Sequence, residues 1–107
     1  KIIGIEPASR QHKLSGIKKI SNLPPEHRPK ILDYSLIDDI IEVEDHEAFE
    51  AGVQLARTEG LMVGPTTGAC LHAAKLVGAQ TSGVAVVISP DDATKYVSAY
   101  AEYLANR

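Results

Sequence analysis

The chain has 107 residues, a formal net charge of −3, and 44% hydrophobic and 23% charged residues. This length allows one domain or a piece of one, and the composition is that of a globular protein. The charge argues against nucleic acid or an anionic membrane surface as a partner, and no apolar run approaches the ~20 residues of a membrane span. A single cysteine, Cys70, excludes an internal disulfide and fits a reducing cytoplasm.

Residues 1–6 form an Ile-rich segment that predicts a strand buried on both faces and ended by Pro7. This strand is already under way at Lys1, without an initiator Met, so we expect a fragment or a processed product. Residues 8–30 carry several cations and three prolines and predict a long irregular loop. Such a loop is functional or disordered in many compact domains, and the alternative is a plain solvated surface loop.

Residues 40–43 predict a second strand. Asp45 then offers an N-cap for a helix that Gly60 is expected to end. Acidic residues near the start of this helix and Arg57 near its end complement the helix dipole. Its apolar residues recur at i, i+3 and i+4, which predicts a broad buried face.

The stretch from Gly60 to Ala69 ends an apolar run at Gly64, turns through Pro65 and leads into a helix expected from about Gly68 to Val77. Thr66 or Thr67 is placed to cap that helix. A hydroxyl, a helix N-terminus and small residues together suit a polar ring or an anion; an ordinary capped helix is the alternative. The helix is apolar nearly all round, which predicts that it lies in an interior.

Residues 83–88 are continuously apolar and rich in β-branched side chains, which predicts a central parallel strand. Asp91 or Asp92 would cap a last helix whose apolar residues recur at i, i+3, i+4 and i+7. The element order is that of an α/β fold, a parallel sheet flanked by helices with right-handed crossovers.

No catalytic residue and no metal site are predicted from the residues alone. The four histidines are scattered, and Cys70 and His72 lie about 200° apart on a helix, so they cannot share a metal. A thiol within an apolar helix is usually inert. A Gly-rich phosphate loop and a Ser/His/Asp set are both absent from the sequence.

Several segments, in one order, resemble the cysteine synthase family: the O-acetylserine sulfhydrylases and cystathionine β-synthases, pyridoxal-phosphate (PLP) enzymes of fold type II. The central run, from Glu47-Ala48 through Leu55-Ala56-Arg57 and Glu59-Gly60-Leu61 to Gly64–Ala69, is similar to the family's "EA…LAR.EGI..G.SSGA". Other similar segments are Gly4–Pro7 ("GVEP"), Leu14–Lys19 ("IPGIRRW"), Asp33–Asp38 ("D.SLID") and Pro90–Ser98 ("PD.GERYLS"). The resemblance covers nearly the whole chain.

The resemblance implies that residues 1–107, with the loop 8–30 among them, are the C-terminal part of the PLP-binding large domain, which is tryptophan-synthase-β-like. It implies that Thr66 hydrogen-bonds the pyridine nitrogen of PLP. The other contacts it implies are Gly64, Pro65 and Pro90 on the cofactor and Gly16 and Ile17 on the substrate.

The implied activity of the whole enzyme is β-replacement on O-acetylserine or a related β-substituted serine, a transferase reaction that forms cysteine. The family's Schiff-base lysine and phosphate cradle lie N-terminal to everything present here, so this chain alone is expected to be inactive and not to bind PLP. We expect a homodimer or an association with the missing N-terminal part. The alternatives are a non-catalytic interaction domain and, less favoured, an unrelated nucleotide-binding α/β module.

Overall fold

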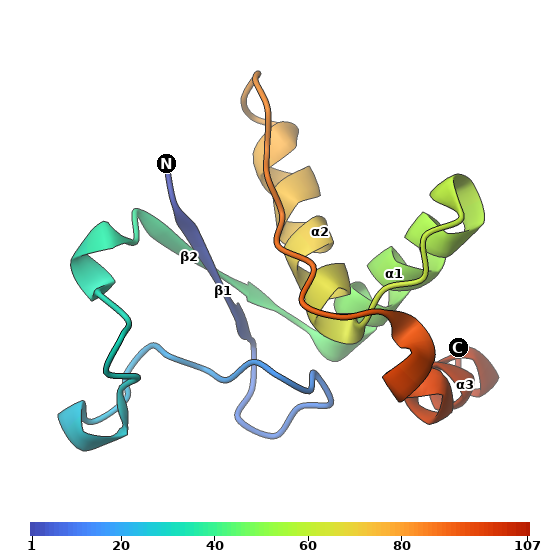
Figure 1. Ribbon diagram of the computed structural model, residues 1–107, viewed down its shortest axis with the longest axis horizontal. Helices are drawn as coiled ribbons and strands as arrows, with labels where there is room; N and C mark the ends of the chain where they lie inside the picture. Colours follow the sequence, from blue (N-terminus) through green and yellow to red (C-terminus); the bar gives the residue numbers. More distant parts are fainter.

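The computed structural model describes residues 1–107, whose arrangement is drawn in Figure 1. Two short strands lie on one side and three helices on the other, with single 3-10 turns between them. The elements are β1 (Ile3–Pro7), β2 (Asp39–Val43), α1 (Asp45–Glu59), α2 (Pro65–Gly78) and α3 (Val97–Ala105), with 3-10 turns at Pro25–His27, Tyr34–Leu36 and Ala93–Tyr96. None of the helices has both the length and the apolar character needed to cross a membrane.

The two predicted N-terminal strands are confirmed, and they pair in parallel. The register runs from Ile3 opposite Asp39 to Pro7 opposite Val43. The prediction that β1 is buried on both faces is wrong for most of it, because only Glu6 and Pro7 are fully buried. A two-stranded sheet has few neighbours to cover its faces.

The long loop over residues 8–30 is irregular, as predicted, but it is anchored to the strands. The Glu6 carboxylate, whose residue is 1% exposed, accepts hydrogen bonds from the backbone N–H groups of Ile20 and Ser21, both at 2.9 Å. The Ser21 hydroxyl donates to the same carboxylate at 2.6 Å. Burial by itself raises the pKa of Glu6, but the hydrogen bonds from Ser21 and Ile20 and the charge of Lys19 outweigh it and lower that pKa. The loop is therefore tied down by a buried ionised group.

Helix α1 ends as predicted and begins differently. Gly60 follows it in the left-handed conformation at φ 70°, which a glycine adopts without strain. The N-cap is Glu44, however, and not Asp45. The Glu47 carboxylate reaches back to the Glu44 backbone N–H at 2.9 Å. Asp45 instead links the start of α1 to the long loop, because its carboxylate accepts a hydrogen bond from the backbone N–H of Lys13 at 3.0 Å.

The core lies where α1 crosses α2 and the loop turns beneath them. Its six buried members are Leu14, Val43, Ala48, Phe49, Ala69 and Ala73. Helix α3 adds to it through two tyrosines on the Phe49 ring: Tyr100 edge-on at 5.2 Å and Tyr103 stacked at 5.5 Å between ring centroids. Gly68 lets α1 and α2 approach closely, because a Cβ there would overlap the Ala48 carbonyl oxygen.

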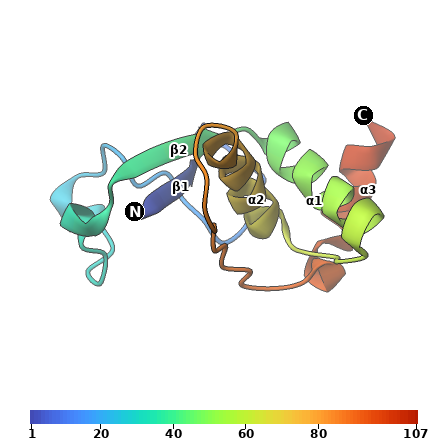
Figure 2. The ribbon, with the colours of Figure 1, turned by 90° about the horizontal axis from the view of Figure 1, so that it is seen from above.

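The predicted central strand over residues 83–88 is not a strand in this structure. The segment is extended and returns alongside α2 in Figures 1 and 2, yet its backbone makes no backbone–backbone hydrogen bond. Val84, Val86 and Ile88 are 95%, 84% and 75% exposed. A strand exists only through its neighbours, and β1 and β2 do not reach this segment. Helix α2, predicted to lie in an interior, is buried over its first turn, at Ala69 and at Ala73, whereas its last residues are partly or fully exposed.

Candidate functional site

Helix α2 begins earlier than its sequence predicts, and this changes the role of both threonines. Gly64 is the N-cap and Pro65 the first helical residue, a position that suits proline because it needs no N–H partner. Thr66 and Thr67 therefore lie inside the first turn and are not its caps. Both are buried, at 9% and 4% exposed.

Thr66 meets the loop that carries the predicted substrate residues. Its hydroxyl donates to the Ser15 backbone carbonyl at 2.8 Å, across 51 positions of sequence. Gly16 follows at φ 99°, and a Cβ placed there would lie 3.6 Å from the Thr66 hydroxyl oxygen. Ile17 packs against the core by its partly buried side chain. The structure thus brings Thr66 and Gly16 together, from segments that the sequence alone could not place side by side.

The segment after Pro90 closes the other side of the same turn. Pro90 itself is exposed, whereas the Asp91 backbone carbonyl accepts from the Gly64 N–H at 3.4 Å. A Cβ at Gly64 would overlap one Asp91 carboxylate oxygen and lie 2.8 Å from the ring of Tyr96. Glycine is needed here because these two side chains occupy the space. Asp91 and Tyr96, which lie 27 and 32 positions after Gly64, therefore hold this turn.

Asp91 and Tyr96 also bind each other. The Tyr96 hydroxyl donates to Asp91 Oδ2, while the other carboxylate oxygen, Oδ1, is buried without a hydrogen-bond partner. The hydrogen bond to Asp91 raises the pKa of Tyr96, and a smaller opposing effect comes from the side chain of Ser15. Sequence reasoning considered Asp91 only as a possible helix cap and assigned no role to Tyr96, although both lie in the segment that resembles "PD.GERYLS".

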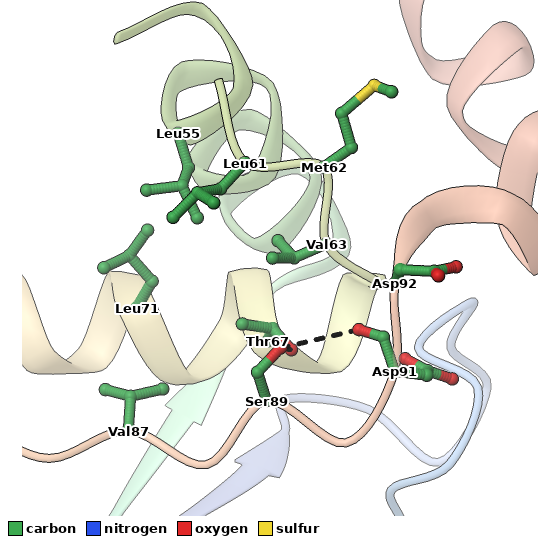
Figure 3. A pocket seen from close by; sticks show the side chains of 10 residues that line it. All are labelled: Leu55, Leu61, Met62, Val63, Thr67, Leu71, Val87, Ser89, Asp91 and Asp92. Atoms are coloured by element: carbon green, nitrogen blue, oxygen red, sulfur yellow. Dashed lines mark hydrogen bonds between the residues drawn. The ribbon is translucent and has the colours of Figure 1, made fainter. Parts of the chain in front are cut away.

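Thr67 faces a different space from Thr66. Its hydroxyl lies 2.9 Å from that of Ser89, at the side of a cavity of about 470 Å³ that Figure 3 shows. In that view the carboxylates of Asp91 and Asp92 point away from the apolar side chains of the cavity. The apolar side chains are those of Leu55, Leu61, Met62, Val63, Leu71 and Val87. Thr66 is not part of this lining, so the cavity is distinct from the predicted cofactor contact.

The remaining candidate groups offer no chemistry. No group of three His, Cys, Asp or Glu side chains is placed to hold a metal ion. Cys70 is half-buried, and burial raises the pKa of its thiol, which disfavours the reactive thiolate. His72 lies 3.5 Å from the Glu47 carboxylate on the neighbouring helix.

Residues 1–91 match the family described as pyridoxal-phosphate dependent enzyme. The chain belongs to this family. The PLP-dependent relatives include the cysteine synthase of Aquifex aeolicus (strain VF5), which is 31% identical over 102 residues, 91% of this chain and 30% of the relative.

Two solved structures carry the same fold. The crystal structure of the O-acetylserine dependent cystathionine beta-synthase from Helicobacter pylori superposes with a TM-score of 0.74 at 30% identity, over 92% of this chain and 33% of that one. The crystal structure of a hydrogen sulfide-producing enzyme from Fusobacterium nucleatum superposes with a TM-score of 0.74 at 31% identity, over 91% of this chain and 35% of that one. The predicted resemblance and fold class, an α/β fragment of a fold type II PLP enzyme, are confirmed. The chain spans about a third of the length of these relatives.

The start of α2 suits one part of PLP. A pyridine nitrogen is a hydrogen-bond acceptor, and the buried Thr66 hydroxyl is a neutral donor at a helix N-terminus. A hydroxyl has one hydrogen, and here Ser15 accepts it, so a bound ring would take that hydrogen over from the Ser15 carbonyl. The roles of Gly64, Pro65, Pro90, Gly16 and Ile17 toward a ligand, and the place of residues 1–107 at the C-terminal end of a large domain, stay predictions.

Proposed function

We propose that this chain supplies the ring-nitrogen side of the cofactor site in a PLP-dependent cysteine synthase-like enzyme. The reaction of the complete enzyme would be β-replacement on O-acetylserine or a related β-substituted serine, forming cysteine. The observation that carries this proposal is the hydrogen bond that joins Thr66, on α2, to the Ser15–Gly16 loop. It puts a buried neutral donor beside an exposed glycine-containing loop that a small amino acid can approach.

PLP, when bound, supplies an electron sink for bond breaking next to the amino-acid nitrogen. Thr66 would donate a hydrogen bond to its ring nitrogen without giving up the proton, because an alcohol is far too weak an acid. A carboxylate in this place would hold the nitrogen protonated and make the sink stronger. A neutral donor therefore favours β-elimination and β-replacement over transamination. Gly16, which has no side chain, would leave the substrate free to approach.

The chain would act together with further polypeptide. The exposed Val84–Ile88 segment is apolar on both sides, the pattern of a strand inside a parallel sheet, and its backbone groups are unpaired. A partner that places a parallel strand beside it would satisfy these groups and cover exposed residues of α2. The rest of a family enzyme would supply such a strand, whereas a second copy of this chain related by a two-fold axis would bring the same segment alongside in the antiparallel direction. The same exposed segment also favours the second candidate function, a non-catalytic interaction domain.

A chimera tests the catalytic proposal. Residues 1–107 would replace the matching segment of the Aquifex aeolicus cysteine synthase, and cysteine formation from O-acetylserine and sulfide would be measured with PLP present. We expect Thr66→Ser to keep activity and Thr66→Ala to lose most of it. Thr67→Ala is the matched control, because Thr67 is equally buried and makes its hydrogen bond to Ser89. If Thr66→Ser is no more active than Thr66→Ala, the hydroxyl does not have the proposed role.

A further inference from the structure

The peptide unit that joins Val63 to Gly64, directly before α2, is held at both ends by residues from the C-terminal part of the chain. Its carbonyl oxygen, on Val63, accepts a hydrogen bond from the Tyr100 hydroxyl at 2.8 Å. Its N–H, on Gly64, donates to the Asp91 backbone carbonyl at 3.4 Å. Because a peptide unit is planar, with its C=O and N–H on opposite sides, these two contacts together set its orientation.

The Tyr100 hydroxyl is the only hydrogen-bond donor to the Val63 carbonyl in the structure. Val63 lies outside the helices and strands, and no backbone N–H donates to its carbonyl. Gly64 follows as the N-cap of α2, at φ −70° and ψ 163°, and a glycine backbone takes many other conformations when it is not held. The orientation of this peptide unit therefore decides how the chain enters the turn that carries Thr66.

We propose that Tyr100 is a positioning residue: its hydroxyl fixes the Val63–Gly64 peptide unit and thereby the direction of the Thr66 hydroxyl at the start of α2. The proposal rests on the function proposed above for Thr66 and deepens it. Tyr100 would not touch a ligand; it would act through the backbone from Val63 to Thr66.

Tyr100 is itself held firmly on α3, which lies beside α1 (Figure 2). Its ring packs edge-on against Phe49, with 5.2 Å between the ring centroids. Gly52 on α1 leaves room for it, because a Cβ there would overlap the Tyr100 hydroxyl oxygen and lie 3.1 Å from the ring carbon that bears the hydroxyl. Burial, and to a lesser degree the charge of Asp91, raises the pKa of Tyr100 to about 12, so the hydroxyl stays a donor near neutral pH.

Amide hydrogen exchange of the 107-residue chain, followed residue by residue by NMR, tests the proposal without any cofactor. Tyr100→Phe keeps the ring and removes only the hydroxyl. We expect the Gly64 amide to exchange roughly 5-fold faster in this variant, the ratio that corresponds to the net contribution of one neutral hydrogen bond. We also expect the Val63 carbonyl-carbon resonance to shift, because that nucleus reports directly on the lost hydrogen bond.

Tyr103→Phe is the matched control on the same helix. The Tyr103 ring stacks on the same Phe49, and its hydroxyl also makes one hydrogen bond, to the Glu50 carboxylate, away from the turn. This variant should leave the Gly64 exchange rate and the Val63 resonance unchanged. Equal values in wild type and Tyr100→Phe would overturn the proposal. An equal change in Tyr103→Phe, or a uniform acceleration at amides throughout α1 and α2, would overturn it as well, because either marks a general loss of stability.

In the chimera described above, Tyr100→Phe should lower kcat by up to roughly 5-fold and leave the KM for O-acetylserine unchanged, because Tyr100 would act only through Thr66. A raised KM with an unchanged kcat would place the effect of Tyr100 on the substrate and would overturn the role through Thr66. The exchange measurement needs no PLP, so the two proposals fail separately. A chimera in which Thr66→Ala keeps its activity would refute the proposed function and leave the hold of Tyr100 on the Val63–Gly64 peptide unit intact.

Discussion

Replacing Gly68 with alanine places a methyl group on the face of α2 that packs against α1. That methyl carbon would lie far inside 3.0 Å of the Ala48 carbonyl oxygen, a separation that real Cβ atoms essentially never show. It would also lie 3.1 Å from the Ala48 carbonyl carbon and 3.3 Å from the Gly52 backbone nitrogen. All three atoms belong to the backbone of a helix, so none can rotate away. The two helices would have to move apart, which loosens the core around Ala69 and Phe49.

The expected cost follows from two opposing effects. Overpacking a core costs up to about 3 kcal/mol, and the upper end applies when the obstacle is backbone. The higher helix propensity of alanine compared with glycine stabilises a helix by about 1 kcal/mol. The free energy of unfolding should therefore fall by about 2 kcal/mol in Gly68→Ala.

Gly78→Ala is the matched control on the same helix. Its methyl group would meet nothing within 4 Å, so only the gain in helix propensity applies, and stability should rise by up to about 1 kcal/mol. Urea unfolding followed by the far-ultraviolet circular dichroism of the helices measures both variants. If the two variants unfold within about 0.5 kcal/mol of each other, the close α1–α2 crossing does not exist in solution.

Three further outcomes are expected. Because hydrogen bonds lower the pKa of Glu6, the ionised Glu6 should stabilise the fold above the ordinary glutamate pKa, and this stabilisation should be lost as pH falls through the lowered value. Urea unfolding at a series of pH values should show this acid dependence in the wild type and not in Glu6→Gln. The same acid dependence in both proteins would contradict the prediction. Incubation of the chain with PLP, followed by borohydride reduction and peptide mapping, should give scattered weak labelling; one lysine labelled stoichiometrically would show that the chain carries its own attachment site. Val86→Asp should reduce association in sedimentation equilibrium and lower binding of a hydrophobic dye, since Val86 is 84% exposed; a wild-type chain that is a compact monomer and binds no dye would refute this.

The sequence by itself determined the local elements and the family. Short Ile-rich runs located β1 and β2, and apolar spacing with Gly60 located α1, because these signals depend on neighbouring residues only. The motif run through Gly64–Ala69, together with the other similar segments in the same order, indicated a PLP-dependent relative, which the family match bears out.

Only the tertiary structure decided which residues meet. The hydrogen bond between Thr66 and Ser15 and the packing of Asp91 and Tyr96 on Gly64 join segments tens of residues apart, and no local pattern encodes such contacts. The absence of the expected third strand has the same cause. Val84–Ile88 has the composition of a strand, but a strand needs a hydrogen-bonding neighbour, and no other segment of the chain pairs with it. Side-chain periodicity records what a segment can bury, whereas pairing depends on whether another backbone lies within reach.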